Sequence, residues 1–189
     1  LLPTPITYYI PHNKPAAQKC SSYVKDTTDF LNKIRNQKIN RNRKPVFIVS
    51  MDVVSLYPNI DHSEGIAACE HFMNLRKNQN FPTKIIARLI NCILKCNTME
   101  FLGRYFHQIL GTAMGTPMAV NFANLFMSRF EESLLSSYKS QFILQPSLWL
   151  RYIDDIFFIW EGNEKSLKHF LKFYNEFSKN EHMKSNIKF

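Results

Sequence analysis

The stretch RYIDDIFFIW, residues 151–160, points most directly to the fold, because it sets two adjacent carboxylates inside a strand-like apolar run. Asp154 and Asp155 have bulky apolar neighbours on both sides. A hairpin turn is one explanation, but two-residue turns favour Asn-Gly or Asp-Gly, and no glycine lies nearby. Like charges in a partly desolvated site repel each other. The sequence therefore also predicts a neutralising cation here, and oxygen ligands suit Mg²⁺ or Mn²⁺.

A third carboxylate follows another apolar run. PVFIVSM, residues 45–51, is rich in β-branched residues and predicts a buried strand that ends at Asp52. Taken alone, Asp52 is equally well explained as a solvated strand end. If this strand lies beside the one that carries Asp154 and Asp155, the three carboxylates converge. Two divalent ions then fit, in the arrangement used for phosphoryl transfer.

The composition is that of a folded, basic protein. The chain has 189 residues, 45% of them hydrophobic, and 24 Lys and Arg against 15 Asp and Glu give a net charge of +9. This balance indicates an anionic partner, most commonly nucleic acid, although a merely basic protein has the same signature. The four cysteines form no CxxC pair and favour reduced thiols in an intracellular protein. No signal peptide and no apolar run of about 20 residues is visible, so no membrane partner is expected.

The order of the predicted elements is mixed. Helices are expected at 21–36, 62–77, 82–96, 118–135 and 163–179, hairpins at 99–110 and 147–160, and a basic loop, QKINRNRK, at 37–44. Thr116 and Pro117 suit the N-cap and the first position of the fourth helix. A further strand is expected in the last residues. This order predicts an α+β domain with an antiparallel sheet backed by helices.

Three segments in order resemble motifs A, B and C of a reverse transcriptase palm. They are MDVVSLYPNI (51–60), QILGTAMGTPMAVNFAN (108–124) and YIDD (152–155). The resemblance is strongest to Penelope-like retroelement reverse transcriptases, which are related to telomerase, and it covers nearly the whole chain. It implies a polymerase palm with catalytic carboxylates at strand ends. The implied activity is RNA-directed DNA polymerisation by two-metal nucleotidyl transfer onto a primer 3′-hydroxyl, with two Mg²⁺ or Mn²⁺ ions.

The resemblance also implies roles for individual residues. Asp52, Asp154 and Asp155 would be catalytic and hold the metals, with Asp155 at longer range. The remaining implied positions touch nucleotide or nucleic acid: Tyr57 and Gly115 the incoming nucleotide, and Gln108, Gly111, Thr116, Pro117 and Tyr152 the template and primer. Glycines in such a turn let backbone approach a ligand. A core aromatic is the alternative for Tyr57 and Tyr152, and a helix-capping loop is the alternative for the motif B residues.

The implied domain layout places a connecting segment and helix at 1–44 and the palm at 45–189. The N-terminal part of the fingers and the thumb lie outside this chain, which begins at Leu1 and ends in the apolar NIKF, as expected for a piece of a longer protein. The isolated piece is therefore expected to be inactive. The implied partners are an RNA template, a DNA primer, deoxynucleoside triphosphates and, in the parent protein, a possible GIY-YIG endonuclease domain. The implied location is intracellular, in the nucleus.

Two other functions remain open on the sequence alone. DVVSLYP also resembles the first palm motif of family B DNA-directed DNA polymerases, but that family usually has Asp-Thr-Asp in its third motif and a Lys-rich helix in between. A non-catalytic nucleic-acid-binding remnant of a retroelement is the second. The intact set of three carboxylates argues against the remnant, and divalent-dependent primer extension separates it from an enzyme.

Overall fold

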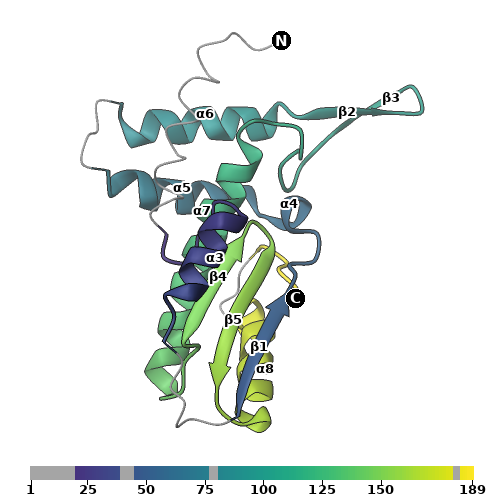
Figure 1. Ribbon diagram of the computed structural model, residues 1–189. Coiled ribbons are helices and arrows are strands. Elements are labelled where there is room, and N and C mark those ends of the chain that lie inside the picture. Colours follow the sequence, from purple (N-terminus) through teal and green to yellow (C-terminus); the bar gives the residue numbers. More distant parts are fainter. Residues whose placement is uncertain (1–19, 39–44, 77–80, 181–183) are drawn as a thin grey trace. The chain divides into compact units, whose positions relative to one another are not determined.

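The computed structural model describes residues 20–38, 45–76, 81–180 and 184–189 (Figure 1). The proline-rich start and most of the expected basic loop at 37–44 lie outside these ranges. The chain forms two compact units. Unit 1 comprises Leu1–Ala17, Ser55–Met127 and Lys184–Asn186, and unit 2 comprises Gln18–Val54, Ser128–Met183 and Ile187–Phe189.

Unit 2 is built on a three-stranded antiparallel sheet. Its strands are β1 (Val46–Met51), β4 (Leu148–Tyr152) and β5 (Asp155–Glu161), and β5 is the central strand in the order β1-β5-β4. β4 and β5 form the expected hairpin, and β1 pairs with β5 from Val46↔Glu161 to Met51↔Ile156. The two apolar runs that carry the carboxylates are therefore neighbouring strands, as the convergence argument requires.

Helices cover the two faces of this sheet unequally (Figure 1). On one face, aromatic side chains of β4 and β5 pack on α8 (Glu164–Asn180), with Trp149 stacked on Phe158 and Trp160 stacked on Phe170. On the other face lies the shorter α3 (Thr27–Arg35), whose Phe30 meets Phe157 edge to face. The fold class is thus α+β with an antiparallel sheet and helices, as predicted.

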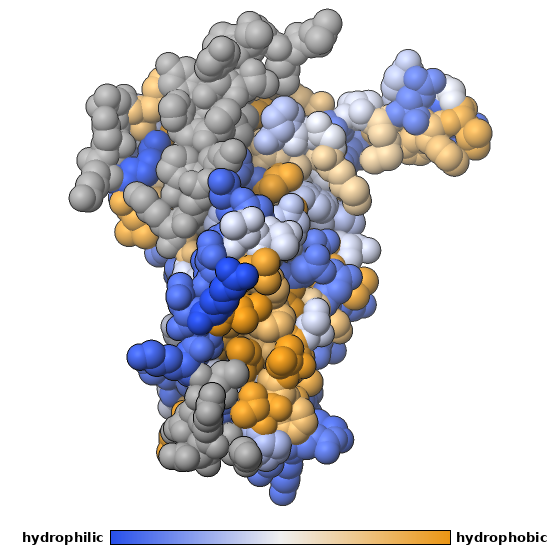
Figure 2. All heavy atoms as spheres, viewed as in Figure 1, coloured by the Kyte–Doolittle hydropathy of each residue, from blue (hydrophilic) through white to orange (hydrophobic). Residues whose placement is uncertain are grey.

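The prediction of a buried strand at 45–51 is wrong. β1 is an edge strand, and its side chains alternate between exposed and half-buried, with Ile48 74% exposed. A continuous apolar run is typical of a strand that is covered on both faces. Here, instead, alternate side chains of β1 add to an apolar surface over the sheet, which Figure 2 shows in the lower half of the view.

Unit 1 consists of short helices and a separate hairpin. After α4 (Leu56–Asn59), the helices α5 (His62–Asn74) and α6 (Thr83–Lys95) lie side by side, followed by the hairpin β2 (Thr98–Phe101) and β3 (Arg104–His107). The long helix α7 (Ala119–Gln141) begins in unit 1 and continues in unit 2. Gly65 of α5 faces the Phe122 ring of α7 so closely that a Cβ atom would lie 2.1 Å from it.

Two local predictions fail. α7 begins at Ala119 rather than near Pro117, because the carbonyl of Met118 accepts its first helical hydrogen bond, from Phe122 (2.9 Å). The Thr116 hydroxyl instead donates to the Ala113 carbonyl at 3.0 Å, so Thr116 is not the N-cap. The last residues form no strand within 184–189, although the Lys188 carbonyl accepts from the Val54 amide at 2.8 Å.

Candidate active site

The three aspartates lie together at one end of the unit 2 sheet. Asp52 follows β1 directly, and because Met51 pairs with Ile156, Asp52 comes opposite Asp155 at the start of β5. Asp154 belongs to the two-residue loop between Tyr152 and Asp155, which are themselves a pair. The amide after Asp52, that of Val53, donates to the Asp154 carbonyl at 3.2 Å. The register of the sheet therefore brings the three residues together.

The loop that carries Asp154 has an unusual backbone. Ile153 has φ 57°, a left-handed conformation that β-branched residues rarely adopt. The two explanations for Asp154 and Asp155 are therefore compatible. The pair lies at a tight hairpin turn that contains no glycine, and it also belongs to the carboxylate cluster. Tyr152, at the end of β4, is 48% exposed and lies beside the carboxylate that its pairing partner carries.

The electrostatics of the cluster are those of like charges held close together. Partial burial raises the pKa of the Asp155 carboxyl, and the charges of Asp154 and then Asp52 raise it further. In the part of the chain that the structure describes, none of the three carboxylates forms an ion pair with Lys or Arg. Within the described residues, the cluster therefore keeps its negative charge without a basic side chain paired to it.

The cluster is open rather than a closed metal cage. Among the described residues, no three carboxylate, imidazole or thiolate side chains surround a point closely enough to hold an ion by themselves. This arrangement fits Mg²⁺, which keeps several waters and is usually bound through one or two carboxylates together with substrate phosphates. The donors are all hard oxygens, as Mg²⁺ and Mn²⁺ prefer.

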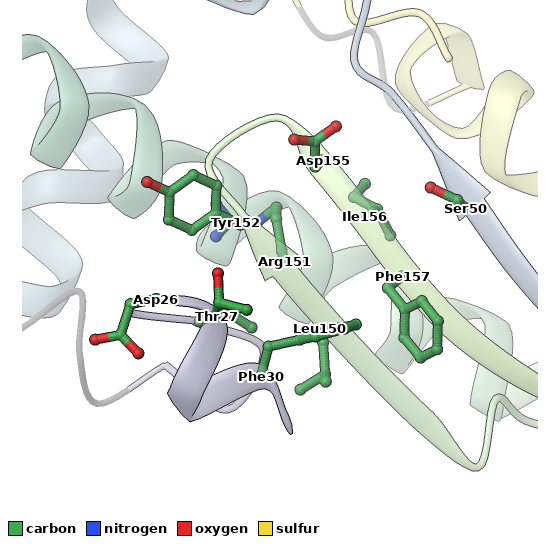
Figure 3. Close-up of a pocket in the computed structure, with 11 residues that line it drawn as sticks. Asp26, Thr27, Phe30, Ser50, Leu150, Arg151, Tyr152, Asp155, Ile156 and Phe157 are labelled. Atoms are coloured by element: carbon green, nitrogen blue, oxygen red, sulfur yellow. The ribbon is translucent and has the colours of Figure 1, made fainter. Parts of the chain in front are cut away.

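A cavity of about 470 Å³ opens beside the cluster, within unit 2. Figure 3 shows Asp155 at its rim, at the start of β5, with Tyr152 on the neighbouring strand and Asp26 and Thr27 at the start of α3. Its floor is apolar and is formed by residues that include Phe30, Leu150 and Phe157. The carboxylate of Asp155 is thus accessible on the sheet face that α3 covers in part.

The other predicted positions, apart from Tyr152, belong to unit 1. There the end of motif A and the turn of motif B touch each other. Gly111 has φ 74°, and a Cβ atom on it would lie 2.4 Å from the Tyr57 carbonyl oxygen and 2.5 Å from the Pro58 Cα atom. The Thr112 amide donates to that same Tyr57 carbonyl (3.0 Å), and the Gly111 amide donates to the Ile60 carbonyl (3.0 Å). Close backbone packing within the protein is therefore enough to explain why a glycine occupies position 111.

The remaining motif B side chains differ in how far they are engaged. The Gln108 side chain accepts from Asn97 (2.5 Å) and donates to the Leu110 carbonyl (2.8 Å). Gly115 is exposed, and a Cβ atom added to it would meet nothing within 4 Å, while Pro117 is exposed beside the half-buried Thr116. Tyr57 is half-buried on α4. Gly115 is thus the glycine of this turn with room for a ligand.

The sequence reasoning missed a buried ion pair beneath the carboxylates. Arg151 and Glu131 have side chains that are 0% and 3% exposed, and Arg151 Nε lies 2.9 Å from Glu131 Oε1. The signal was available, because Arg151 has the same parity in β4 as the inward-facing Trp149 and Glu131 falls inside an apolar helix pattern. A charged residue at a core position of a strand indicates a partner.

Comparisons with known proteins identify the family of this chain. The family described as reverse transcriptase (RNA-dependent DNA polymerase) matches residues 4–188. The chain belongs to the reverse transcriptase family. It is therefore an RNA-directed DNA polymerase domain. The telomerase reverse transcriptase of Oryza sativa subsp. japonica is 31% identical over 90 residues, which are 43% of this chain and 7% of that protein.

Solved telomerase structures share the fold. Telomerase from Candida tropicalis in complex with a TWJ fragment of telomeric RNA matches 97% of this chain with a TM-score of 0.69 and 16% identity. Apo telomerase from the same organism, truncated from its C-terminal domain, gives 0.66 and 15%. The chain spans 32% and 38% of those two chains.

Within the described residues, no helix is long and apolar enough to cross a membrane.

Proposed function

We propose that this chain is the palm region of a Penelope-like retroelement reverse transcriptase and that Asp52, Asp154 and Asp155 are its catalytic carboxylates. The observation that carries the proposal is the β1–β5 register, which sets Asp52 opposite Asp155 and beside Asp154. The family match supports reverse transcription over the family B polymerase alternative. In this layout residues 45–189 are the palm, and residues 1–44 lead into it from the fingers.

Asp52 and Asp154 are assigned as the main ligands of two Mg²⁺ or Mn²⁺ ions, with Asp155 completing the set at longer range. When bound, such ions activate the primer 3′-hydroxyl and neutralise charge on the transferred phosphate. The protein contributes the fixed spacing of the oxygens, since two antiparallel strands and the Val53–Asp154 hydrogen bond hold the carboxylate backbones. The open geometry leaves room for the triphosphate to supply the remaining ligands.

Tyr57 is assigned to contact the sugar of the incoming nucleotide. Gly115 is assigned to let the backbone of its turn approach that nucleotide. Template and primer are assigned to Gln108, Gly111, Thr116, Pro117 and Tyr152. The engaged side chain of Gln108 and the packed Gly111 support an indirect role for these two, in shaping the turn. The partners are an RNA template, a DNA primer and deoxynucleoside triphosphates, and in the parent protein the rest of the fingers, the thumb and a possible GIY-YIG endonuclease domain. We assign the parent protein to the nucleus.

Primer extension by the full-length parent protein tests this function. We expect divalent-dependent extension that is faster on an RNA template than on a DNA template of the same sequence. Faster extension on DNA would favour the family B alternative, and binding without extension would indicate a non-catalytic remnant. Residues 1–189 alone are expected to bind nucleic acid without extending a primer.

A further inference from the structure

Arg151 joins the loop of the three aspartates to helix α7. Its guanidinium donates hydrogen bonds from Nε to Glu131 Oε1, from the NH2 nitrogen to Ser128 Oγ and from the NH1 nitrogen to the Ile153 carbonyl, each of 2.9 Å. Glu131 and Ser128 lie on α7, within unit 2. One planar group therefore reaches both the helix and the peptide bond that precedes Asp154.

Stability alone is a weak explanation for this contact. Burying an Arg–Glu pair costs desolvation, and apolar residues of similar volume often give equal or greater stability. The pair is nevertheless satisfied in detail, since Glu131 Oε1 also accepts from Trp149 Nε1 (3.0 Å) and Glu131 Oε2 accepts from Ser22 Oγ (2.5 Å). A network of this kind fixes one geometry, which is what a reacting site needs.

The contact acts at the strained residue of the loop. Ile153 has φ 57°, and residues held in such conformations persist where the surroundings over-determine them. The Ile153 carbonyl is held by Arg151, and the carbonyl of the next residue, Asp154, is held by the Val53 amide. The two peptide groups that flank the Asp154 Cα atom are thus both anchored, one by the Arg151 guanidinium and one by the Val53 amide just after β1.

The backbone of Arg151 is hydrogen-bonded as well. Its amide donates to the Ser22 carbonyl (2.7 Å), and its carbonyl accepts from the Val24 amide (2.9 Å), so the segment before α3 extends the pairing of β4 at this residue. Backbone and side chain of Arg151 are therefore both held by hydrogen bonds, and the guanidinium links α7 to the loop.

We propose that Arg151 is a positioning residue for polymerisation, whose guanidinium fastens the Asp154 loop to Glu131 and Ser128 of α7. The inference rests on the proposed catalytic role of Asp154. Lysine keeps the charge opposite Glu131, but its ammonium is a point charge and does not reproduce a planar fork that reaches three acceptors. Arg151→Lys should therefore retain the ion pair and lose the loop contact.

The test uses the full-length protein and measures single-nucleotide incorporation, below the melting temperature of every variant. Arg151→Lys is expected to lower kcat by roughly 10- to 100-fold, as a misplacement of about 1 Å does, while KM and the template–primer Kd change little. Mn²⁺ binding without nucleotide, followed by electron paramagnetic resonance, is expected to weaken. Ser22→Ala, which removes a Glu131 contact in the same buried network but not the loop contact, is the matched control and should leave kcat and Mn²⁺ binding unchanged.

Three outcomes would overturn the inference. The first is a wild-type kcat in Arg151→Lys, and the second is an equal loss in Ser22→Ala, which would indicate a general effect of the network on stability. If Arg151→Lys does not fold, the apolar pair Arg151→Met with Glu131→Leu replaces it, and it is expected to fold and to show the same loss of kcat. Failure of both variants to fold is the third, because the contact would then serve folding.

Asp154→Asn, assayed in parallel, separates this inference from the proposed function. If Asp154→Asn abolishes extension while Arg151→Lys behaves as wild type, the positioning role fails and the catalytic assignment stands. If Asp154→Asn extends primers normally, the proposed function itself is wrong.

Discussion

The two hairpins that the structure describes have the same loop length and opposite surroundings. β2–β3 and β4–β5 each close with two residues, 102–103 and 153–154, and each loop holds a non-glycine residue at positive φ. All eight residues of β2 and β3 are exposed, Leu102 in the loop between them is 85% exposed, and Figure 2 shows apolar side chains at the hairpin tip. β5, in contrast, is the central strand of a sheet with helices on both faces.

The difference shows how a strained loop becomes a fixed one. Leu102 and Gly103 have φ 51° and 72°, the pattern of a type I′ turn, and the described contacts of that loop are confined to the hairpin itself. Ile153 carries similar strain, but Arg151 and Val53 hold the carbonyls on either side of Asp154. The two loops therefore share their length and a strained first residue, and the tertiary contacts distinguish the loop that we assign to catalysis.

The largest expected effect comes from the carboxylate of Asp154 in the β4–β5 loop. Asp154→Asn in the full-length protein should lower primer extension by about 10³-fold or more, since it removes a proposed metal ligand. Unfolding should not follow, because the substitution removes one of several repelling charges. Glu100→Gln in the exposed hairpin is the matched control and should extend primers at the wild-type rate. Extension rates and thermal melting of the two variants check this, and near-normal extension by Asp154→Asn would refute the metal assignment.

The second effect concerns substrate choice and asks whether unit 1 contributes to it. If the Tyr57 ring leaves no space for a 2′-hydroxyl, the exclusion is steric, so Tyr57→Phe should keep the deoxynucleotide preference. Tyr57→Ala should lose about 10- to 100-fold of it, seen as improved kcat/KM for ribonucleotides, because selectivity is the ratio of those values.

Rates for the two nucleotide types on one template provide the measurement. Because Tyr57 is half-buried, a packing role is the competing explanation. In that case Tyr57→Ala should lose stability and slow both substrates alike. An unchanged ratio in Tyr57→Ala would favour packing.

Much of unit 2 could be predicted from the sequence, because its signals are local. The apolar run before Asp52, the run around Asp154 and the helical period at 163–179 give β1, β5 and α8 close to their observed bounds. The adjacency of β1 and β5 was only a condition of the argument, and the sheet order confirms it. Three carboxylates gathered by two strands were thus within reach of sequence reasoning.

The features that could not be predicted depend on contacts with distant parts of the chain. The sequence of β1 is that of a buried strand, yet as an edge strand it exposes Ile48, and nothing local distinguishes the two. The Arg151–Glu131 pair joins residues that are 20 positions apart on different elements, so neither shows its partner in a sequence window. Thr116 and Pro117 form a good start signal, but the turn before α7 takes them instead.

A smaller effect concerns pH and the crowding of charge in the held loop. The Asp155 pKa is raised in the folded protein, so its contribution to stability is present below the usual carboxyl pKa and is lost as the pH rises through the raised value. In metal-free buffer, Asp155→Asn should therefore gain stability over the wild type between about pH 4 and pH 7. The gain should stay below about 1 kcal/mol, since water screens an exposed group.

Asp29→Asn on α3 is the control of opposite sign. Hydrogen bonding to Lys33 lowers the Asp29 pKa, so its stabilising contribution is present above the usual carboxyl pKa and is lost as the pH falls. Chemical denaturation at several pH values compares the two variants with the wild type. The same pH trend in both variants would contradict the crowding of charge at Asp155.

The smallest expected effect is in the exposed hairpin. Leu102→Asn would place Asn-Gly in a loop whose two residues both have positive φ, which is the preferred type I′ sequence. Since leucine in the left-handed region costs about 1–2 kcal/mol and asparagine visits it more readily, the hairpin should gain up to about 1 kcal/mol. Amide hydrogen exchange at residues of β2 and β3 should slow, while exchange in β4 and β5 stays unchanged.

Ile153→Asn provides the contrast, because the loop there has positive φ at its first position only and Arg151 already holds its carbonyl. Equal slowing of exchange by both substitutions, each in its own hairpin, would contradict this comparison. Loop strain alone would then determine how stable each hairpin is, and the tertiary contacts of Arg151 would not distinguish the two loops.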